Sequence, residues 1–180
     1  MIVVGASTAP WLTSATLAQS AVTTIRVGNG PWGVAINPTT NRIYVANFMS
    51  NDVSVVDGAT NQLLATVPVG FQNRFVAVSS IENRIYVAGS RPGEVAGQLA
   101  YIDGQSHNVL GPLQADRSTD VALDPLSGGL YVASATSDLV TVLDSTGRSS
   151  IAVGHEPTGL AIDAELRRLY GPITEATTYR

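Results

Sequence analysis

The side chains that could do acid–base or metal chemistry in this sequence are few. It holds two histidines and no cysteine, which excludes disulfides, thiolate metal sites and a cysteine nucleophile. His155 and Glu156 are adjacent in the segment GHEPTG, where they could supply a general base or a metal ligand. His107 stands in QSHN, a turn-like segment. Because no second histidine accompanies His155, we expect an exposed loop histidine and predict no catalytic residue, no metal site and no cofactor.

One glycine-rich segment formally matches a nucleotide-binding motif. Residues 28–33 read GNGPWG, which has the G-x-G-x-x-G spacing. Dinucleotide binding requires a strand before this segment and a helix after it, so that the helix N-terminus meets the pyrophosphate. The residues that follow, VAINP, indicate a strand and a turn. The segments 70–75 (GFQNRF) and 154–159 (GHEPTG) occupy corresponding places, so we interpret all three as connectors.

Six side chains in these connectors and in nearby loops are candidates for ligand recognition. They are Trp32, Arg74, Arg91, Glu94, His155 and Glu156. Exposed tryptophan and arginine are frequent anchors of binding surfaces. Trp32 and Arg74 occupy equivalent connectors of adjacent repeats and form the strongest pair. The alternative for Trp32 is a packing role in the core, since large aromatic side chains serve both purposes.

Three aspartates, Asp57, Asp103 and Asp144, recur once per repeat. A ring of carboxylates is one interpretation of this recurrence. Asp-Gly and Asp-Ser pairs are turn formers, however, and each of these pairs follows a segment with strand-like alternation. We therefore predict hairpin turns, with Gly58 accepting a positive φ.

The elements that position these residues are indicated by an internal repeat. The four copies read GVAINPTTNRIYVAN (33–47), FVAVSSIENRIYVAG (75–89), DVALDPLSGGLYVAS (120–134) and GLAIDAELRRLYGPI (159–173). Their tyrosines, Tyr44, Tyr86, Tyr131 and Tyr170, are 42, 45 and 39 residues apart. A period near 40 residues with strand-like copies is typical of a β-propeller. The tyrosines are expected to pack between blades.

Each full copy predicts a four-stranded antiparallel blade and hence an all-β chain with minimal helix. In the first copy the expected strands are 34–37, 42–46, 52–57 and 62–69. Residues 1–21 are predicted to be a possible remnant signal peptide or a disordered N-terminus, and β-propeller repeats extend over 22–180. Within the repeats we expect a closing strand at 22–28, blades at 29–70, 71–115 and 116–154, and a partial blade at 155–180. One blade cannot bury both of its faces alone, so the blades must stack.

The ends of the repeat array predict an incomplete ring. The chain stops at Arg180, before a third strand of the fourth unit, while 23–28 (TTIRVG) matches the closing strand 65–70 (ATVPVG). Pairing of the two ends would leave the slot of the third strand empty. An open arc, a fragment of a longer chain, and completion by further repeats or by another chain are the alternatives, and we favour a fragment.

The N-terminal segment bears on where in or outside the cell the protein is located. Residues 1–25 carry no charged side chain. A secretory signal remnant is one interpretation, although a basic first region and a longer apolar run are missing. A disordered or edge-strand N-terminus is the other. No stretch approaches the ~20 apolar residues of a membrane span. We expect a secreted, periplasmic or cell-surface protein.

The tetrapeptides YVAN (44–47), YVAG (86–89) and YVAS (131–134) resemble the YVTN-family β-propeller repeat. The frame GxxPxGVAI before the first copy and VSVVDGATN (53–61) after it are also similar to that family. The resemblance covers about 28–180, with Thr replaced by Ala in copies one to three and YGPI in the fourth. It implies a bacterial or archaeal surface-layer or periplasmic protein, and a ring that is usually seven-bladed.

Three functions are compatible with these observations. The first is a non-enzymatic scaffold that binds a protein or another ligand through its loop face. The second is part of a propeller enzyme, such as a quinoprotein-like oxidoreductase, a lactonase or a lyase. The third is a DNA-binding propeller. The net charge of −4 and the scattered arginines show no phosphate-binding stripe, so we expect no nucleic-acid partner.

Overall fold

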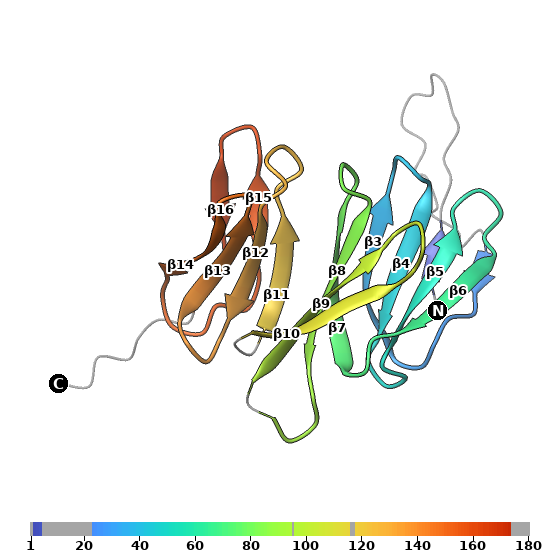
Figure 1. Ribbon diagram of the computed structural model, residues 1–180, viewed down its shortest axis with the longest axis horizontal. Coiled ribbons are helices and arrows are strands. Elements are labelled where there is room, and N and C mark those ends of the chain that lie inside the picture. Colours follow the sequence, from blue (N-terminus) through green and yellow to red (C-terminus); the bar gives the residue numbers. More distant parts are fainter. Residues whose placement is uncertain (1, 5–22, 95, 116–117, 174–180) are drawn as a thin grey trace, which may run out of the picture.

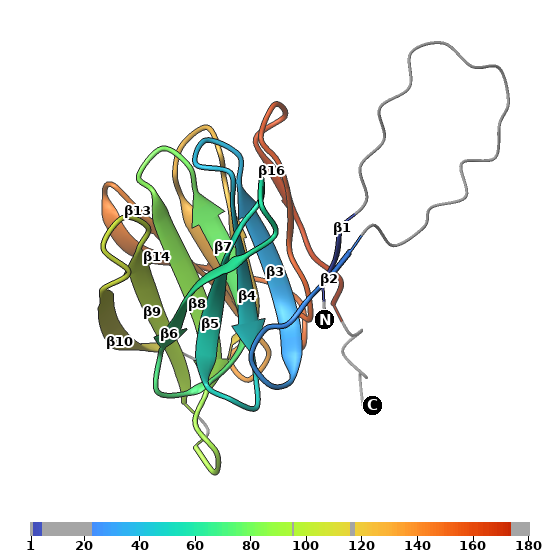
Figure 2. The same ribbon diagram turned by 90° about the vertical axis from the view of Figure 1, so that its right-hand side faces the viewer.

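The computed structural model of the chain describes residues 2–4, 23–94, 96–115 and 118–173. Throughout these residues the backbone forms strands and turns and no helix, which confirms the all-β prediction. Three four-stranded antiparallel sheets follow one another along the chain and stand side by side as blades (Figure 1). In Figure 2 the row is seen from one end, with the first strands of the blades along one margin and the fourth strands along the other. The sheets form an open row rather than a closed ring.

The strand order within each blade follows the sequence, as expected for a propeller. The first blade comprises β3 (Pro31–Asn37), β4 (Arg42–Asn47), β5 (Asp52–Asp57) and β6 (Leu63–Pro68); the second β7 (Gln72–Ser79), β8 (Arg84–Ser90), β9 (Gly97–Asp103) and β10 (Val109–Ala115); the third β11 (Ser118–Leu123), β12 (Leu130–Ser134), β13 (Leu139–Asp144) and β14 (Gly147–Ala152). Two-stranded sheets flank them, β1 (Ile2–Val4) with β2 (Thr23–Ile25) and β15 (Ala161–Asp163) with β16 (Arg168–Tyr170).

The core lies between blades, because the faces that adjacent blades turn toward each other are buried. In the first blade Tyr44, Val53 and Val55 lie on one face and pack against the second blade through residues such as Ile85 and Ile102, all fully buried. The second blade in turn packs against Leu130 and Val132 of the third. This alternation explains the repeated Ile/Leu-Tyr-Val: the first and third of these residues face the preceding blade and the tyrosine faces the following one.

Three details of the predicted elements are wrong. The first strand of the first blade begins at Pro31 rather than at 34, and the fourth is Leu63–Pro68 rather than 62–69. The positive φ of the first hairpin belongs to Asn61, and Gly58 is needed for a different reason: a Cβ there would collide with Asn41. On the N-terminal side β1 pairs with β2, so residues 2–4 form an edge strand, which is one of the two alternatives for this segment.

The first strand of every complete blade contains a β-bulge. The pairing with the second strand shifts between Pro31 and Gly33, between Asn73 and Phe75, and between Ser118 and Asp120. The extra residues are Trp32, Arg74 and Thr119. A bulge bends the strand and turns the extra side chain away from the regular alternation. The three extra residues therefore occupy the same position in each repeat, near the end of the blade where the connectors lie.

That end is called the loop end here. It is formed by the connectors 28–30, 69–71 and 153–160 and by the loops 48–51, 91–94 and 135–138. The turns between first and second strands and between third and fourth strands lie at the opposite end. The predicted signal segment, apart from 2–4, and the last residues of the predicted partial blade, 174–180, lie outside the described residues.

Candidate functional site

The loop end of the first two blades carries a cluster of Trp32, Phe48 and Arg74. The guanidinium carbon of Arg74 lies 5.1 Å from the ring centroid of Trp32 and 4.5 Å from that of Phe48. The two rings are tilted by 51° with centroids 6.1 Å apart. These distances are within the range of cation–π attraction, and Trp32 is 65% exposed. The structure thus brings Trp32 and Arg74 into contact, while their binding role stays a prediction.

The backbone around this cluster fixes its members. Phe48 is held beside the connector because its N–H donates to the carbonyl of Gly30 at 2.8 Å. Gly30 has a φ of 63°, which few other residues adopt at low cost. Gly33 lets the second blade approach, since a Cβ at that position would collide with the carbonyl oxygen of Arg74. Arg74 is therefore positioned by its own bulge and by close contact between two blades.

A buried polar network lies beneath the cluster. The amide of Asn47 donates to the carboxylate of Asp52 at 2.7 Å and to the hydroxyl of Ser54 at 3.0 Å. The N–H of Gly28 donates to the same hydroxyl at 3.2 Å, and the amide of Asn73 donates to the carbonyl of Asp52 at 2.8 Å. The network ties the first connector and the second blade to one hairpin. The terminal Asn of the YVAN tetrapeptide therefore has a structural role here.

Arg91 and Glu94 pair with each other inside a single loop of the second blade. Their closest side-chain atoms are 3.8 Å apart, and both side chains are nearly half exposed. Glu94 also accepts a hydrogen bond of 3.3 Å from the amide of Gln98, which is buried. An exposed ion pair of this kind contributes little stability. Both charges are thus available at the loop end, partly neutralising each other.

His155 is oriented by Asp138 in the loop end of the third blade. The Nδ1 atom of His155 lies 3.2 Å from both carboxylate oxygens of Asp138, and the N–H of Glu156 donates to the same carboxylate at 3.0 Å. The hydrogen bond to Asp138 raises the pKa of His155. The Glu156 N–H and then His155 lower the pKa of Asp138. Both side chains are about half exposed. Sequence reasoning named His155 and Glu156 but not this pairing, which joins residues 17 positions apart.

The recurring aspartates hold turns. Asp57 accepts the N–H groups of Ala59 and Thr60 at 2.8 and 2.9 Å. Asp103 and Asp144 likewise accept N–H groups from the turns that follow them. The N–H groups of Thr60 and Ala59, assisted by the side chain of Arg42, lower the pKa of Asp57 to about 2. These carboxylates lie at the end of the blades opposite the loop end and form no common site.

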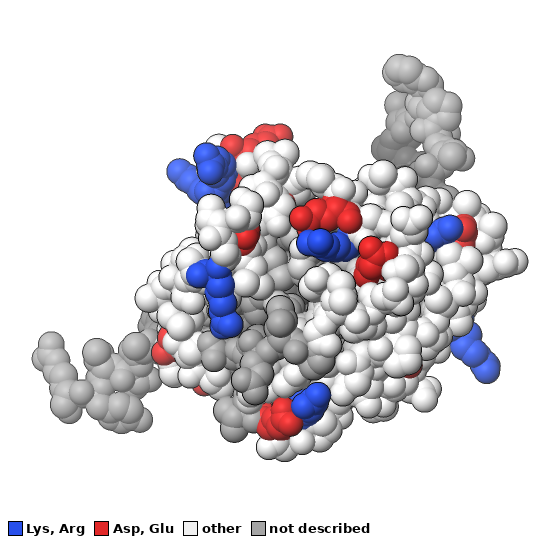
Figure 3. All heavy atoms as spheres, in the orientation of Figure 1, with Lys and Arg blue, Asp and Glu red and all other residues white. Residues whose placement is uncertain are grey.

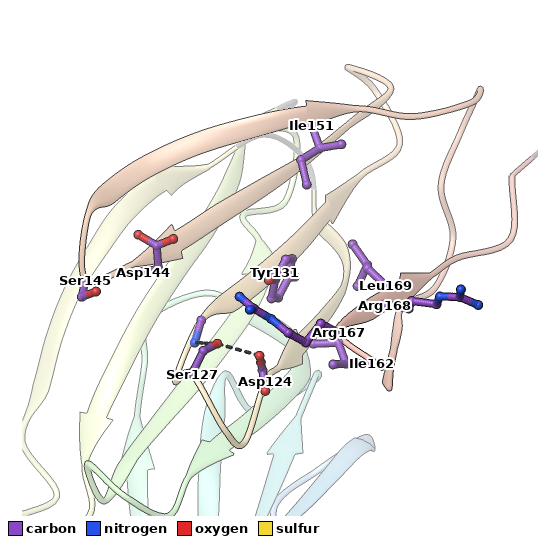
Figure 4. Close-up of a pocket in the computed structure, with 11 residues that line it drawn as sticks. Asp124, Ser127, Tyr131, Asp144, Ser145, Ile151, Ile162, Arg167, Arg168 and Leu169 are labelled. Atoms are coloured by element: carbon purple, nitrogen blue, oxygen red, sulfur yellow. Dashed lines mark hydrogen bonds between the residues drawn. The ribbon is translucent and has the colours of Figure 1, made fainter. Parts of the chain in front are cut away.

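A hollow of about 460 Å³ opens between the third blade and β15–β16, where sequence reasoning placed no site (Figure 4). Tyr131 and Ile151 line it from the third blade, and Ile162 and Leu169 from the two-stranded sheet. Asp124, Asp144 and the arginines Arg167 and Arg168 lie around it. Its counterpart between the first two blades is filled by side chains of β9, among them Ala100 and Ile102. The hollow is therefore the space that a third strand would fill.

Charge is sparse over the face shown in Figure 3. Arginine and acidic side chains are scattered there, several of them next to each other, and most of the surface is uncharged. The described part of the chain contains no group of three or more His, Cys, Asp or Glu arranged to hold a metal ion. It also contains no helix long and apolar enough to cross a membrane.

Comparisons with known proteins agree on the fold. The chain matches no protein-family model. It is 23% identical over 183 residues to the uncharacterised protein YncE of Salmonella typhimurium, covering 97% of this chain and 50% of that protein. Hydrazine synthase of Kuenenia stuttgartiensis is similar in structure with a TM-score of 0.72 and 17% identity, covering 92% of this chain and 47% of that one.

A second similar solved structure is described as a β-propeller domain. The Myceliophteria thermophila Cps50 (Swd1) beta-propeller domain has a TM-score of 0.67 and 14% identity, covering 83% of this chain and 50% of that one. The chain spans about half the length of each of these three proteins. At these identities the likeness shows the fold alone: the chain consists of β-propeller blades.

Proposed function

We propose that this chain is a non-enzymatic recognition module that binds a protein partner through the loop end, with Trp32, Phe48 and Arg74 as the centre of the binding surface. The observation that carries the proposal is the position of the Arg74 guanidinium over two aromatic rings, one of them largely exposed. Tryptophan and arginine dominate the energetics of many protein interfaces, because they combine apolar area with directed hydrogen bonding.

The chemistry of the cluster favours a carboxylate on the partner. Among the described residues no carboxylate forms an ion pair with Arg74, and its Nε atom is buried without a hydrogen-bond partner. A planar guanidinium stacked on aromatic rings is preorganised for a bidentate carboxylate. An Asp or Glu side chain flanked by an apolar residue would satisfy both parts of the cluster.

An array of acidic and neutral peptides, probed with the purified chain at physiological salt, tests this function. Acidic peptides with an apolar neighbour should bind, and Arg74→Ala should weaken that binding roughly tenfold or more. Arg148→Ala is the matched control, since Arg148 is exposed on β14 and far from the cluster in sequence. Equal binding by Arg74→Ala and the parent chain would contradict the proposal.

Membership of the YVTN-repeat family and export from the cell are parts of the same proposal. The tetrapeptides YVAN, YVAG and YVAS and the charge-free N-terminal segment support them. Export is tested by fusing residues 1–25 to a reporter enzyme that is active only outside the cytoplasm. Reporter activity equal to that of a fusion lacking these residues would argue against export by this segment.

An enzymatic role is the second candidate, and the Asp138–His155 pair is the observation that favours it. A carboxylate that orients an imidazole and raises its pKa is a common arrangement for a general base. The pair is exposed, and a substrate would have to supply or meet further groups. Hydrolysis of a model lactone that is lost in His155→Ala, and retained in His107→Ala, would favour the enzymatic role over the recognition role.

A further inference from the structure

The two-stranded sheet at the N-terminal side occupies the positions of the third and fourth strands of a blade. β2 corresponds to 65–67 of β6, because TTIRVG (23–28) aligns with ATVPVG (65–70). In the first blade Val53, Ser54 and Val55 pair with Val67, Thr66 and Ala65. Ile2, Val3 and Val4 pair with Ile25, Thr24 and Thr23 in the same order. β1 therefore stands in register with β5.

The sheet at the C-terminal side supplies the complementary half. β15 corresponds to 35–37 of the first strand β3, and β16 to 42–44 of the second strand β4. The pairs Ala161–Tyr170 and Asp163–Arg168 repeat the pairs Ala35–Tyr44 and Asn37–Arg42. One chain thus carries strands one and two of a blade at one side of its row and strands three and four at the other (Figure 2).

We propose that two copies of this chain associate so that β15–β16 of one copy joins β1–β2 of the other in a single four-stranded blade. A twofold axis makes two such composite blades at once, and with three complete blades in each copy the result is a closed ring of eight blades. Propellers of 4–8 blades are typical. The ring would pair the edge of β16 that no described strand occupies, and an unpaired edge of this kind can otherwise pair with other strands.

Apolar side chains that are exposed at the two sides of the row correspond to side chains that are packed between the first and second blades. Val76 and Val78 of the second blade pack against the cluster that contains Tyr44 of the first. Their counterparts in the first blade, Val34 and Ile36, are 56% and 59% exposed. The counterpart of Tyr44 is Tyr170, which is 50% exposed. In the proposed ring the partner's Tyr170 would cover Val34 and Ile36 as Tyr44 covers Val76 and Val78.

The hollow beside Tyr131 fits the same assembly. It lies between β12–β14 and β16, on the side where a third strand would pair with β16 (Figure 4). Pro172 does not obstruct that pairing. Its carbonyl accepts a hydrogen bond of 3.3 Å from the N–H of Thr158, in the segment leading to β15. Because the N and C=O of one residue in an extended strand point to the same side, the nitrogen of Pro172 also faces that segment and not the open edge of β16.

The mass of the purified chain in solution tests the assembly. Light scattering after gel filtration should give twice 18.7 kDa. Ile36→Asp should weaken self-association roughly tenfold or more, because it places a charge in the composite junction. Leu126→Asp is the matched control, since Leu126 is 69% exposed in a turn of the third blade outside both junctions. A parent chain that stays at 18.7 kDa at high concentration overturns the proposal.

A cysteine pair distinguishes a second copy from closure within one chain. The register places Val4 of one copy opposite Tyr170 of the other, as Val55 stands opposite Tyr44. Because the chain has no cysteine, every disulfide of the variant Val4→Cys/Tyr170→Cys joins introduced positions, and the two single variants show whether like positions pair. A covalent dimer under oxidising conditions that neither single variant forms supports the proposal. A disulfide within one chain, or none while the Val4→Cys and Tyr170→Cys single variants fold, contradicts it.

Discussion

Trp32 and Arg74 meet because each is the extra residue of a β-bulge at the same position of adjacent blades. Their contact could be anticipated from sequence, since GNGPWG and GFQNRF are aligned by the repeat. The pairing of His155 with Asp138 could not, because the two residues belong to different segments and nothing in either segment specifies the other. The network around Asn47 was equally hidden, since its polar members change from copy to copy: Gly89 and Ser134 replace Asn47 in the next two blades.

The guanidinium of Arg74 should shield one side of the Trp32 indole. In a Trp11→Phe background, which leaves Trp32 as the single tryptophan, Arg74→Ala should increase quenching of the fluorescence by acrylamide and leave the free energy of unfolding within about 1 kcal/mol. Arg91→Ala is the control, since Arg91 pairs with Glu94 instead. Identical quenching constants in the parent chain and in Arg74→Ala would refute the stacked arrangement in solution.

Asp138 should control the titration of His155. Because the folded-state pKa of His155 is raised above 6.5, its stabilising contribution is fully present below about pH 6.5 and is lost as pH rises through the raised pKa. The pKa of Asp138 is lowered from 3.8, so its contribution is present above that value and is lost as pH falls through the lowered pKa. Proton NMR of the imidazole should show a lower pKa in Asp138→Asn than in the parent chain. An unchanged pKa in that variant would exclude the pair.

At the scale of elements, the tyrosine spacing predicted the four-stranded blades, because strand alternation and turn residues repeat with the fold. The bulges were not predictable from the same signals. An extra residue such as Trp32 leaves the composition of a short strand unchanged, and only the pairing with the second strand reveals it. The turn at Asp57 shows the same limit: the sequence marked a turn, while the hydrogen bonding decided that Asn61 carries the positive φ.

The close contact between the first strands of adjacent blades requires a glycine at position 33, which can be tested. Gly33→Ala should lower the free energy of unfolding by about 1–3 kcal/mol, because the added Cβ meets the carbonyl of Arg74 in the next blade. Gly159→Ala, at the same repeat position of β15's connector, is the matched control: its nearest neighbour would be Pro172 at 3.6 Å, an ordinary contact. Urea unfolding monitored by circular dichroism measures both. Equal midpoints for the two variants would mean that the blades are less closely packed than described.

At the scale of the whole molecule, the repeated tyrosine is most buried in the first blade and most exposed in the last two-stranded sheet. Tyr44 is fully buried, Tyr86 and Tyr131 are partly buried, and Tyr170 is half exposed. The repeat predicted this packing role but not the N-terminal strand β1, because 18 residues separate β1 from β2 whereas five or fewer separate the third and fourth strands of the complete blades. The repeat predicted partial blades at both sides of the row, and the structure describes a two-stranded sheet at each side, whose registers match those of strands three and four and of strands one and two of the first blade.

Stability in such an array is close to a sum over neighbouring blades, so equivalent residues should differ in a predictable way. Ile85 and Leu169 hold the same repeat position, but Ile85 is fully buried between two complete blades and Leu169 borders the hollow. Ile85→Ala should cost about 2–5 kcal/mol at every protein concentration. Leu169→Ala should cost less in dilute solution, where chains are single, and more as concentration rises and composite blades form, because only then is the side chain enclosed. Urea unfolding at two protein concentrations a hundredfold apart measures the difference. If Leu169→Ala and Ile85→Ala lower the free energy of unfolding equally in dilute solution, the junction is already filled within one chain.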